Sequence, residues 1–105
     1  MPLYTFMMET RGGTYISQVR ASSPRKAVWK WAEDLNTKAI YGFGAKSKEQ
    51  IIAELHDDEN DGEEFPIRVP QLENTWCYTL LIHGQLVLIN IVKTEEETQK
   101  AKSKK

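Results

Sequence analysis

The sequence predicts an α+β domain in which about four mostly antiparallel strands form a sheet and two helices pack on one face of it. Alternating apolar and polar residues flank glycine-containing turns near both ends of the chain, which is the pattern of β-hairpins. Between these regions lie two segments whose apolar residues recur at helical spacing. A chain of 105 residues, 40% hydrophobic and 28% charged, suits one domain with one core.

The first hairpin is predicted over residues 3–21, with Gly12 and Gly13 as a two-residue turn. Glycine accepts the positive φ angles that such turns need. Counting back from this turn places Phe6 opposite Val19. Alternation then assigns one face of the hairpin to the core. That face consists of Tyr4, Phe6, Met8, Tyr15, Val19 and Ala21.

The first helix is expected to follow Ser23, whose hydroxyl can accept a hydrogen bond from an amide of the first turn. Pro24 stands at the first helical position, where its missing N–H costs no hydrogen bond. We expect this helix to end near Asn36. Its apolar stripe consists of Ala27, Val28, Trp31, Ala32 and Leu35.

The second helix is predicted to begin at Ser47, because Gln50 follows at the spacing of a capping box. Its apolar face is short, and we expect the helix to end near His56 or Asp57. That face consists of Ile51, Ile52 and Leu55. The acidic residues up to position 64 are then expected to form a solvated loop.

Residues 65–70 are expected to be extended and unsuited to a central strand, because they include Pro66 and Pro70. A second hairpin follows over about residues 75–93, turning at residues 83–85. One of its faces carries Trp76, Tyr78, Leu80, Ile82, Val87, Ile89 and Ile91. The other carries Cys77, Thr79, Leu81, His83, Leu86, Leu88, Asn90 and Val92.

The second face of this hairpin provides a candidate interface, because strands that are apolar on both faces are normally covered on both. Its members are Leu81, Leu86, Leu88 and Val92. We predict that these side chains are buried. The cover would come from residues 65–70, from the C-terminal tail, or from a second copy of the chain in a homodimer, and the sequence favours intramolecular cover and a homodimer equally.

Residues 1–94 are assigned to the single domain, and residues 95–105 are expected to form a disordered charged tail without apolar anchors. The N-terminus lacks the basic and apolar regions of a signal peptide. The single cysteine, Cys77, cannot form an intramolecular disulfide. The mainly apolar residues 80–92 are too few and too interrupted to cross a bilayer. We therefore expect a cytoplasmic protein with no membrane association.

No set of residues predicts catalysis, and we expect a non-enzymatic protein. A nucleophile and its base must lie within mutual reach. His56 is expected at a helix end, His83 in a turn and Cys77 inside a strand. Without a catalytic site there is no reason to expect a cofactor.

The acidic stretch partly matches a calcium-binding loop, since Asp57, Glu59 and Asp61 precede Gly62 at the expected spacing. However, Arg68 stands where the twelfth position requires a bidentate Glu. The pattern therefore favours a solvated acidic loop over a metal site.

A basic face on the first helix is the candidate surface for nucleic acid or another partner. It consists of Arg25, Lys26, Trp29 and Lys30. A tryptophan among cations can stack on bases while its neighbours contact phosphates. Against this, Glu33 and Asp34 dilute the charge of the same helix, and the net charge of the chain is −1. The alternative is that Trp29 packs under residues 41–44 or contributes to a protein interface.

The first hairpin and the segment Ser22-Ser23-Pro24-Arg25-Lys26-Ala27-Val28 together are similar to the hairpin-then-helix of HicB-type antitoxin domains. The similarity covers about the first third of the chain, and the glycine-containing segment between strand and helix is missing here. No family is assigned on this basis. The resemblance implies a regulatory binding role.

Two functional hypotheses follow. The first is a small protein-interaction or regulatory domain that associates with itself or with another protein. The second is a nucleic-acid-associated, antitoxin-like regulator that uses the basic face of the first helix. The distance of that face from acidic residues 57–64 discriminates between them, because nearby carboxylates repel phosphate.

Overall fold

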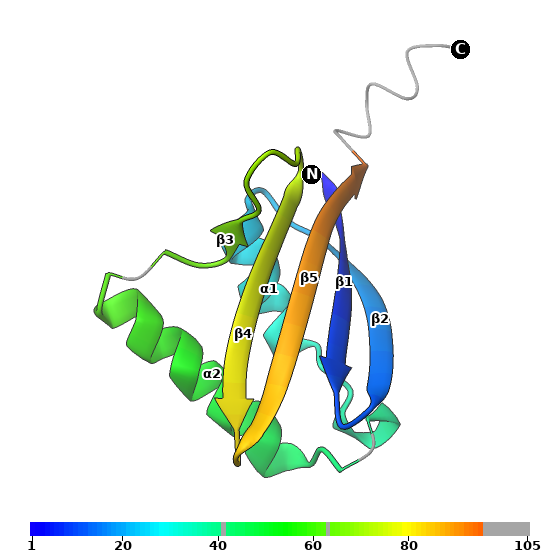
Figure 1. The fold of residues 1–105 in the computed structure, drawn as a ribbon, viewed down its shortest axis with the longest axis vertical. Helices are drawn as coiled ribbons and strands as arrows, with labels where there is room; N and C mark the ends of the chain where they lie inside the picture. Colours follow the sequence, from blue (N-terminus) through cyan, green and yellow to red (C-terminus); the bar gives the residue numbers. More distant parts are fainter. Residues whose placement is uncertain (41, 63, 96–105) are drawn as a thin grey trace.

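A five-stranded antiparallel sheet forms one layer of the fold, and two helices form the other (Figure 1). The computed structural model describes residues 1–40, 42–62 and 64–95. The elements are β1 (Leu3–Thr10), β2 (Gly13–Arg20), α1 (Pro24–Glu33), the 3₁₀ helix η1 (Thr37–Ala39), α2 (Ala45–Asn60), β3 (Ile67–Arg68), β4 (Thr75–Ile82) and β5 (Gln85–Glu95). The strand order is β2-β1-β5-β4-β3. The predicted α+β class is confirmed, with β3 as a short additional strand.

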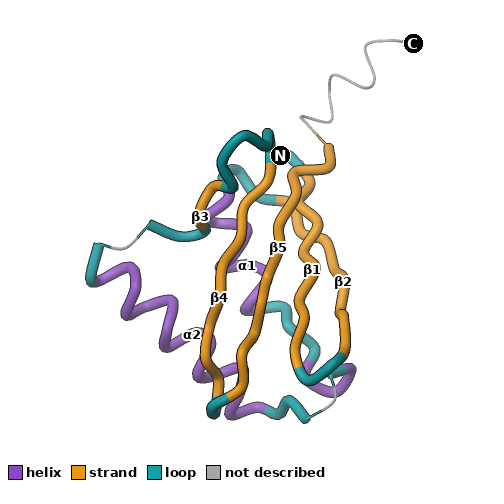
Figure 2. Tube along the Cα trace, viewed as in Figure 1, coloured by secondary structure: helices purple, strands orange, loops and turns teal. Residues whose placement is uncertain are grey.

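Both helices lie on the same face of the sheet, as predicted (Figure 2). Helix α1 packs on β1 and β2, and α2 packs on β4. The Trp31 ring of α1 stacks on the Phe6 ring of β1, with 5.4 Å between the centroids. The largest fully buried side chains come from both layers, and they are Phe6, Met8, Ile51, Leu55, Ile82, Ile89, Ile91, Val28 and Val87.

The turn of the first hairpin lies one residue earlier than predicted, at Arg11 and Gly12, whose φ angles are 50° and 79°. Phe6 consequently pairs with Ser17. The predicted pairing of Phe6 with Val19 is wrong by two residues. A shift of two residues keeps every side chain on its own face, because side chains alternate with a period of two.

Gly13 is the first residue of β2 and pairs with Thr10. A Cβ atom there would lie 2.7 Å from the hydroxyl oxygen of Tyr15, so a larger residue would require that side chain to move. The predicted core face is correct despite the shift, and five of its members are buried while Tyr15 is half-buried. The buried members are Tyr4, Phe6, Met8, Val19 and Ala21.

The second hairpin turns at His83 and Gly84, with φ angles of 52° and 78°. Ile82 therefore pairs with Gln85, which is one of the two turns that the sequence allows. The apolar face predicted for this hairpin points into the core, where Trp76 is half-buried. Its buried members are Tyr78, Leu80, Ile82, Val87, Ile89 and Ile91.

Helix α1 begins as predicted, with the Ser23 hydroxyl oxygen accepting a hydrogen bond from the Lys26 backbone N–H at 3.2 Å. The helix ends at Glu33, so the predicted end near Asn36 is wrong. The Lys48 ammonium of α2 donates to the carbonyl oxygen of Glu33 at 2.8 Å and so satisfies this helix end. Asn36 instead caps η1 with its side-chain oxygen.

Helix α2 is longer than predicted at both ends. Its N-cap is Gly44, and Ser47 lies buried inside the first turn. The helix continues to Asn60, past the predicted end near His56 or Asp57. The expectation that the acidic stretch forms a loop is therefore wrong for residues 57–60.

Tertiary contacts of two acidic side chains explain the extra turn of α2. Asp58 accepts a hydrogen bond from the Tyr78 hydroxyl of β4, and Glu59 lies 3.6 Å from Arg25 of α1. Carboxylates near a helix C-terminus are unfavourable by themselves, because the helix dipole is negative there. Contacts with the sheet and with α1 offset this cost.

Strand β3 confirms that residues 65–70 do not form a central strand. It contains two residues, Ile67 and Arg68, which pair with Cys77 and Trp76 at the outside of β4. Prolines stand before and after it along the chain, and they limit the hydrogen bonds that this segment can make.

Candidate functional site

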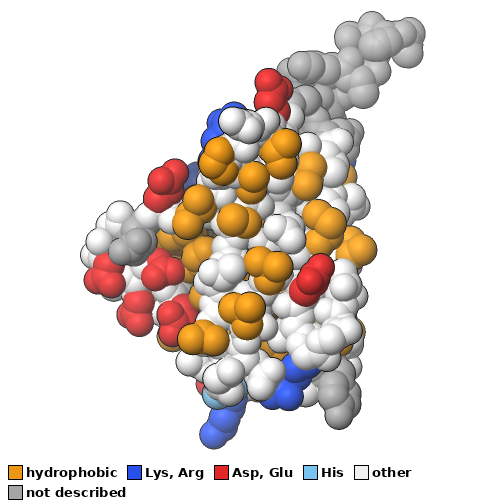
Figure 3. Space-filling model, viewed as in Figure 1, with side chains coloured by type: hydrophobic (Ala, Val, Ile, Leu, Met, Phe, Trp, Pro, Cys, Tyr) orange, Lys and Arg blue, Asp and Glu red, His pale blue; other side chains and the backbone are white. Residues whose placement is uncertain are grey.

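The face of the sheet that points away from the helices carries many apolar side chains (Figure 3). We call it the open face. Its apolar members on the five strands are Leu3, Met7, Ile16, Ile67, Cys77, Leu81, Leu86, Leu88 and Val92. Ile16, Leu81 and Leu86 are 66%, 63% and 59% exposed. Solitary exposed apolar residues are ordinary, but a continuous set across neighbouring strands is typical of an interaction surface.

Of the three alternatives for covering the candidate interface, residues 65–70 do not provide the cover. This segment joins the edge of β4 through β3 instead of crossing the open face. Leu81 and Leu86 are consequently exposed, while Leu88 and Val92 are half-buried. Cover by residues 96–105 lies outside the described part of the chain, and cover by a second copy stays a prediction.

Polar side chains of the open face form hydrogen bonds with one another across three strands. The Gln18 amide donates to the Thr5 hydroxyl at 3.0 Å. Thr5 and Thr94 share a hydrogen bond of 2.9 Å. Burying this row against a partner would therefore leave these polar groups bonded, which removes the main cost of burying polar atoms.

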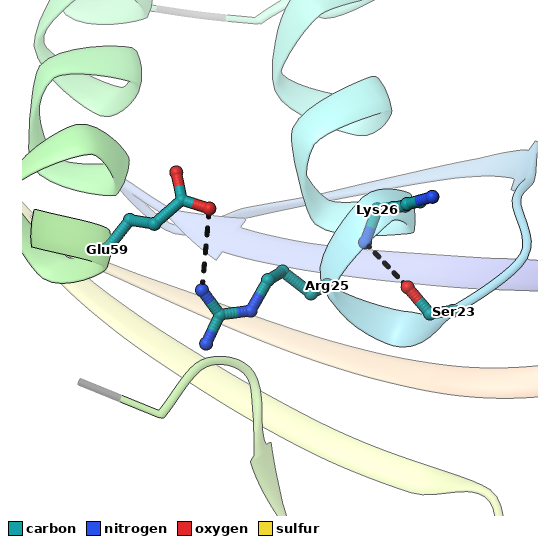
Figure 4. A network of polar contacts seen from close by, with 4 residues as sticks. All are labelled: Ser23, Arg25, Lys26 and Glu59. Atoms are coloured by element: carbon teal, nitrogen blue, oxygen red, sulfur yellow. Dashed lines mark hydrogen bonds and ion pairs between the residues drawn. The ribbon is translucent and has the colours of Figure 1, made fainter. Parts of the chain in front are cut away.

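Two cations of the candidate basic face of α1, Arg25 and Lys30, lie beside acidic partners, and Figure 4 shows the first. The Arg25 guanidinium points toward α2, where it lies 3.6 Å from a Glu59 carboxylate oxygen. The same group stacks 4.3 Å above the centroid of the Phe65 ring. Lys30 forms an ion pair of 3.2 Å with Asp34 on its own helix.

Trp29 is half-buried between the two helices. Its ring meets the His56 ring of α2 edge-on, with 4.8 Å between centroids. The described contact of Trp29 is thus with α2. The alternative that Trp29 packs under residues 41–44 involves position 41, which lies outside the described residues. Lys26 is exposed on the neighbouring turn of α1.

The candidate catalytic residues have separate structural roles. His56 contacts Trp29, and the backbone N–H of His83 donates to the Gln50 side chain at 3.3 Å. Cys77 is half-buried in β4, where it pairs with Ile67. Among residues 1–40, 42–62 and 64–95, no group of three or more His, Cys, Asp or Glu side chains is arranged to hold a metal ion.

The contact between Tyr78 and Asp58 was not apparent from the sequence. Burial raises the pKa of the Tyr78 hydroxyl well above its ordinary value, and the hydrogen bond to Asp58 and the charges of Asp58 and Glu54 raise it further. The hydroxyl therefore stays protonated at neutral pH and donates to Asp58, which joins the acidic end of α2 to β4. Tyr78 and Asp58 are twenty residues apart in the sequence, and local sequence patterns do not predict a contact over that separation.

No protein-family model, curated protein or solved structure matches this chain. The fold and its surfaces therefore carry the functional argument. None of the helices in the described residues is long and apolar enough to span a membrane.

Proposed function

We propose that this chain is a non-enzymatic protein-interaction domain that self-associates through the open face of its sheet. The observation that carries this proposal is the exposure of Ile16, Leu81 and Leu86 on the same face of the sheet, opposite the helices. Complete burial of an aliphatic side chain contributes about 1.5–3 kcal/mol. Burying Leu81 and Leu86, at 63% and 59% exposure, would then contribute about 1–2 kcal/mol each.

A second copy suits this surface because the open face is complementary to itself. Two sheets can pack face to face about 10 Å apart, with the side chains of each filling gaps in the other. The strand residues that line this face include one acid, Glu9, and one strand-end base, Arg20. Few charged side chains would thus lose their hydration on association.

Sedimentation of the wild-type chain and of Leu81→Asp tests this proposal. We expect the wild type to form a dimer and the variant to weaken it by at least about tenfold, since a carboxylate would enter an apolar contact. Leu72→Asp is the matched control, because Leu72 is 52% exposed in a turn outside the strands. A wild type that stays monomeric at high concentration, or a dimer unchanged by Leu81→Asp, would reject the open face as the interface.

The nucleic-acid alternative has weaker support. Glu59 lies beside Arg25, so a phosphate approaching the basic face would meet a carboxylate. Acidic side chains gather near the end of α2 in the same part of the molecule (Figure 3). Salt-sensitive binding of a mixed-sequence DNA duplex or RNA, lost in a Lys26→Glu variant, would favour this alternative over the first proposal.

A further inference from the structure

Strand β2 forms one outer edge of the sheet, with β1 as its neighbour. Thr10 and Gly13 pair directly across the two-residue turn. Such closing pairs exchange hydrogen bonds, and this pattern alternates along an antiparallel ladder. The odd-numbered residues of β2 therefore bond to β1. Ala21 continues this pattern, because its N–H donates to the carbonyl of Pro2, just before β1, at 3.2 Å. Thr14, Ile16 and Gln18 direct their backbone N–H and C=O groups away from the sheet.

This edge lacks the features that usually protect exposed strands. The β1–β2 register is unbroken over eight pairs, and β2 contains neither Pro nor Lys. The opposite edge is different, because β3 has two residues and lies between Pro66 and Pro70. Short edge strands, prolines and bulges prevent pairing with another chain. The β2 edge is therefore suited to accept another strand.

A groove of about 480 Å³ runs beside β2 on the helix side and separates the strand from the end of α1 and from η1. Apolar side chains supply much of its lining, among them Tyr15, Val19, Trp31, Leu35 and Ile40. A strand added to β2 would direct every second side chain to this side of the sheet. The groove can therefore accept side chains of that added strand.

We propose that β2 pairs with β2 of a second copy, antiparallel across a two-fold axis beside Ser17. This register puts Tyr15 opposite Val19 of the second copy on the groove side. Aromatic and β-branched side chains form favourable pairs across strands. Arg20 is the charged residue of β2, and it lies opposite Thr14, so no like charges meet. The small, exposed Ser17 faces its own counterpart.

This pairing joins two five-stranded sheets into one continuous sheet. It uses the strand edge, whereas the proposed function uses the open face. Substitutions at Ser17 leave the open face unaltered, because Ser17 lies on the helix side of the sheet. Edge pairing buries a small area, and small interfaces are typical of weak complexes. We expect this pairing to dissociate on dilution, and to give a dimer in Leu81→Asp and larger assemblies where the open face also pairs.

A charge swap at Ser17 tests the register. Ser17→Lys and Ser17→Glu each place like charges opposite each other at the axis, and each variant alone should dimerise at least about fivefold more weakly than the wild type. An equimolar mixture should recover the wild-type affinity as a heterodimer. Ser22→Lys and Ser22→Glu, at an exposed position before α1, are controls that should change nothing.

A backbone substitution tests the edge itself. Gln18→Pro removes an outward N–H and leaves the hydrogen bonds to β1 in place, so it should abolish pairing. Gln18→Ala loses the same side-chain bond to Thr5 but keeps the N–H, and it should pair normally. If circular dichroism shows that Gln18→Pro does not fold, the two Ser17 variants still test the edge pairing. Wild-type affinity in both single Ser17 variants would overturn the edge pairing, and a dimer that only Leu81→Asp disrupts would leave the open face as the sole interface.

Discussion

Replacing Tyr78 with Phe removes the hydroxyl that fastens the acidic end of α2 to β4. The aromatic ring stays, including its stacking with Phe65 at a centroid distance of 5.5 Å. The lost interaction is a hydrogen bond to a carboxylate, and such bonds contribute about 1.5–3 kcal/mol. Asp58 is half-buried and water can partly replace the donor, so we expect a loss of about 1–2 kcal/mol in the free energy of unfolding.

The assay is urea unfolding at neutral pH, with thermal unfolding as a second measurement. A loss of 1–2 kcal/mol corresponds to a decrease of about 5–15 °C in melting temperature for a domain of this size. Asp58→Asn is the matched variant, because it keeps an acceptor oxygen and removes the charge. We expect it to lose less stability than Tyr78→Phe.

The raised pKa of Tyr78 also predicts a dependence on alkaline pH. The ordinary pKa of the group is 10.0, so below that pH the hydroxyl is protonated in both folded and unfolded chains and its stabilisation is complete. Above pH 10.0 the unfolded chain releases this proton while the folded chain retains it, and stability falls. The Tyr78→Phe variant should lose this part of the alkaline decline. An identical decline in both proteins, together with unchanged neutral stability, would refute the role assigned to this hydroxyl.

Two further predictions concern other contacts. Arg25→Ala should lower the free energy of unfolding, measured in urea, by about 1 kcal/mol, because it removes the cation–π contact with Phe65 and a solvent-exposed ion pair with Glu59. The control is Lys26→Ala, at an exposed position on the same helix. Equal losses of stability in the two variants would contradict this account. Removal of residues 96–105 should leave the melting temperature within about 2 °C of that of the full chain. These residues include no large apolar side chain whose burial could offset the entropy of ordering them. A larger decrease in melting temperature would mean that they contact the domain.

Side-chain facing was predictable in both hairpins because it depends on local alternation. The exact register of the first hairpin was not, since shifts of two residues preserve every face. In the observed turn Arg11 adopts a φ of 50°, although a turn at Gly12 and Gly13 would place glycine at both positions. The preference of such turns for glycine therefore does not determine the register.

The helix boundaries were predicted incorrectly where residues from distant segments contact a helix end. Lys48 closes α1 at Glu33, and Tyr78 contacts Asp58 in the last turn of α2. Capping rules describe interactions within a few residues. They identified Ser23 correctly because its partner, Lys26, is local.

The composition of the candidate interface was predictable, but its cover was not. Alternation placed Leu81 and Leu86 on the face opposite the core, and that is where they lie. The sequence did not show whether residues 65–70 would cross that face or extend the sheet sideways. In the structure, Ile67 and Arg68 pair with Cys77 and Trp76 of β4, so this segment extends the sheet at its edge.

The two candidate surfaces differ in what binding would cost, and this difference favours the sheet over α1. A phosphate bound by Arg25 would compete with Glu59 and Phe65 for the same guanidinium. Burial of the open face breaks no such contact, since Thr5 bonds to both Gln18 and Thr94 within the sheet. Polar groups that keep their partners add little desolvation cost, so the burial of Leu81 and Leu86 would be opposed mainly by the charges of Glu9 and Arg20 on the same face. We therefore expect association to use the side of the molecule that carries no helix.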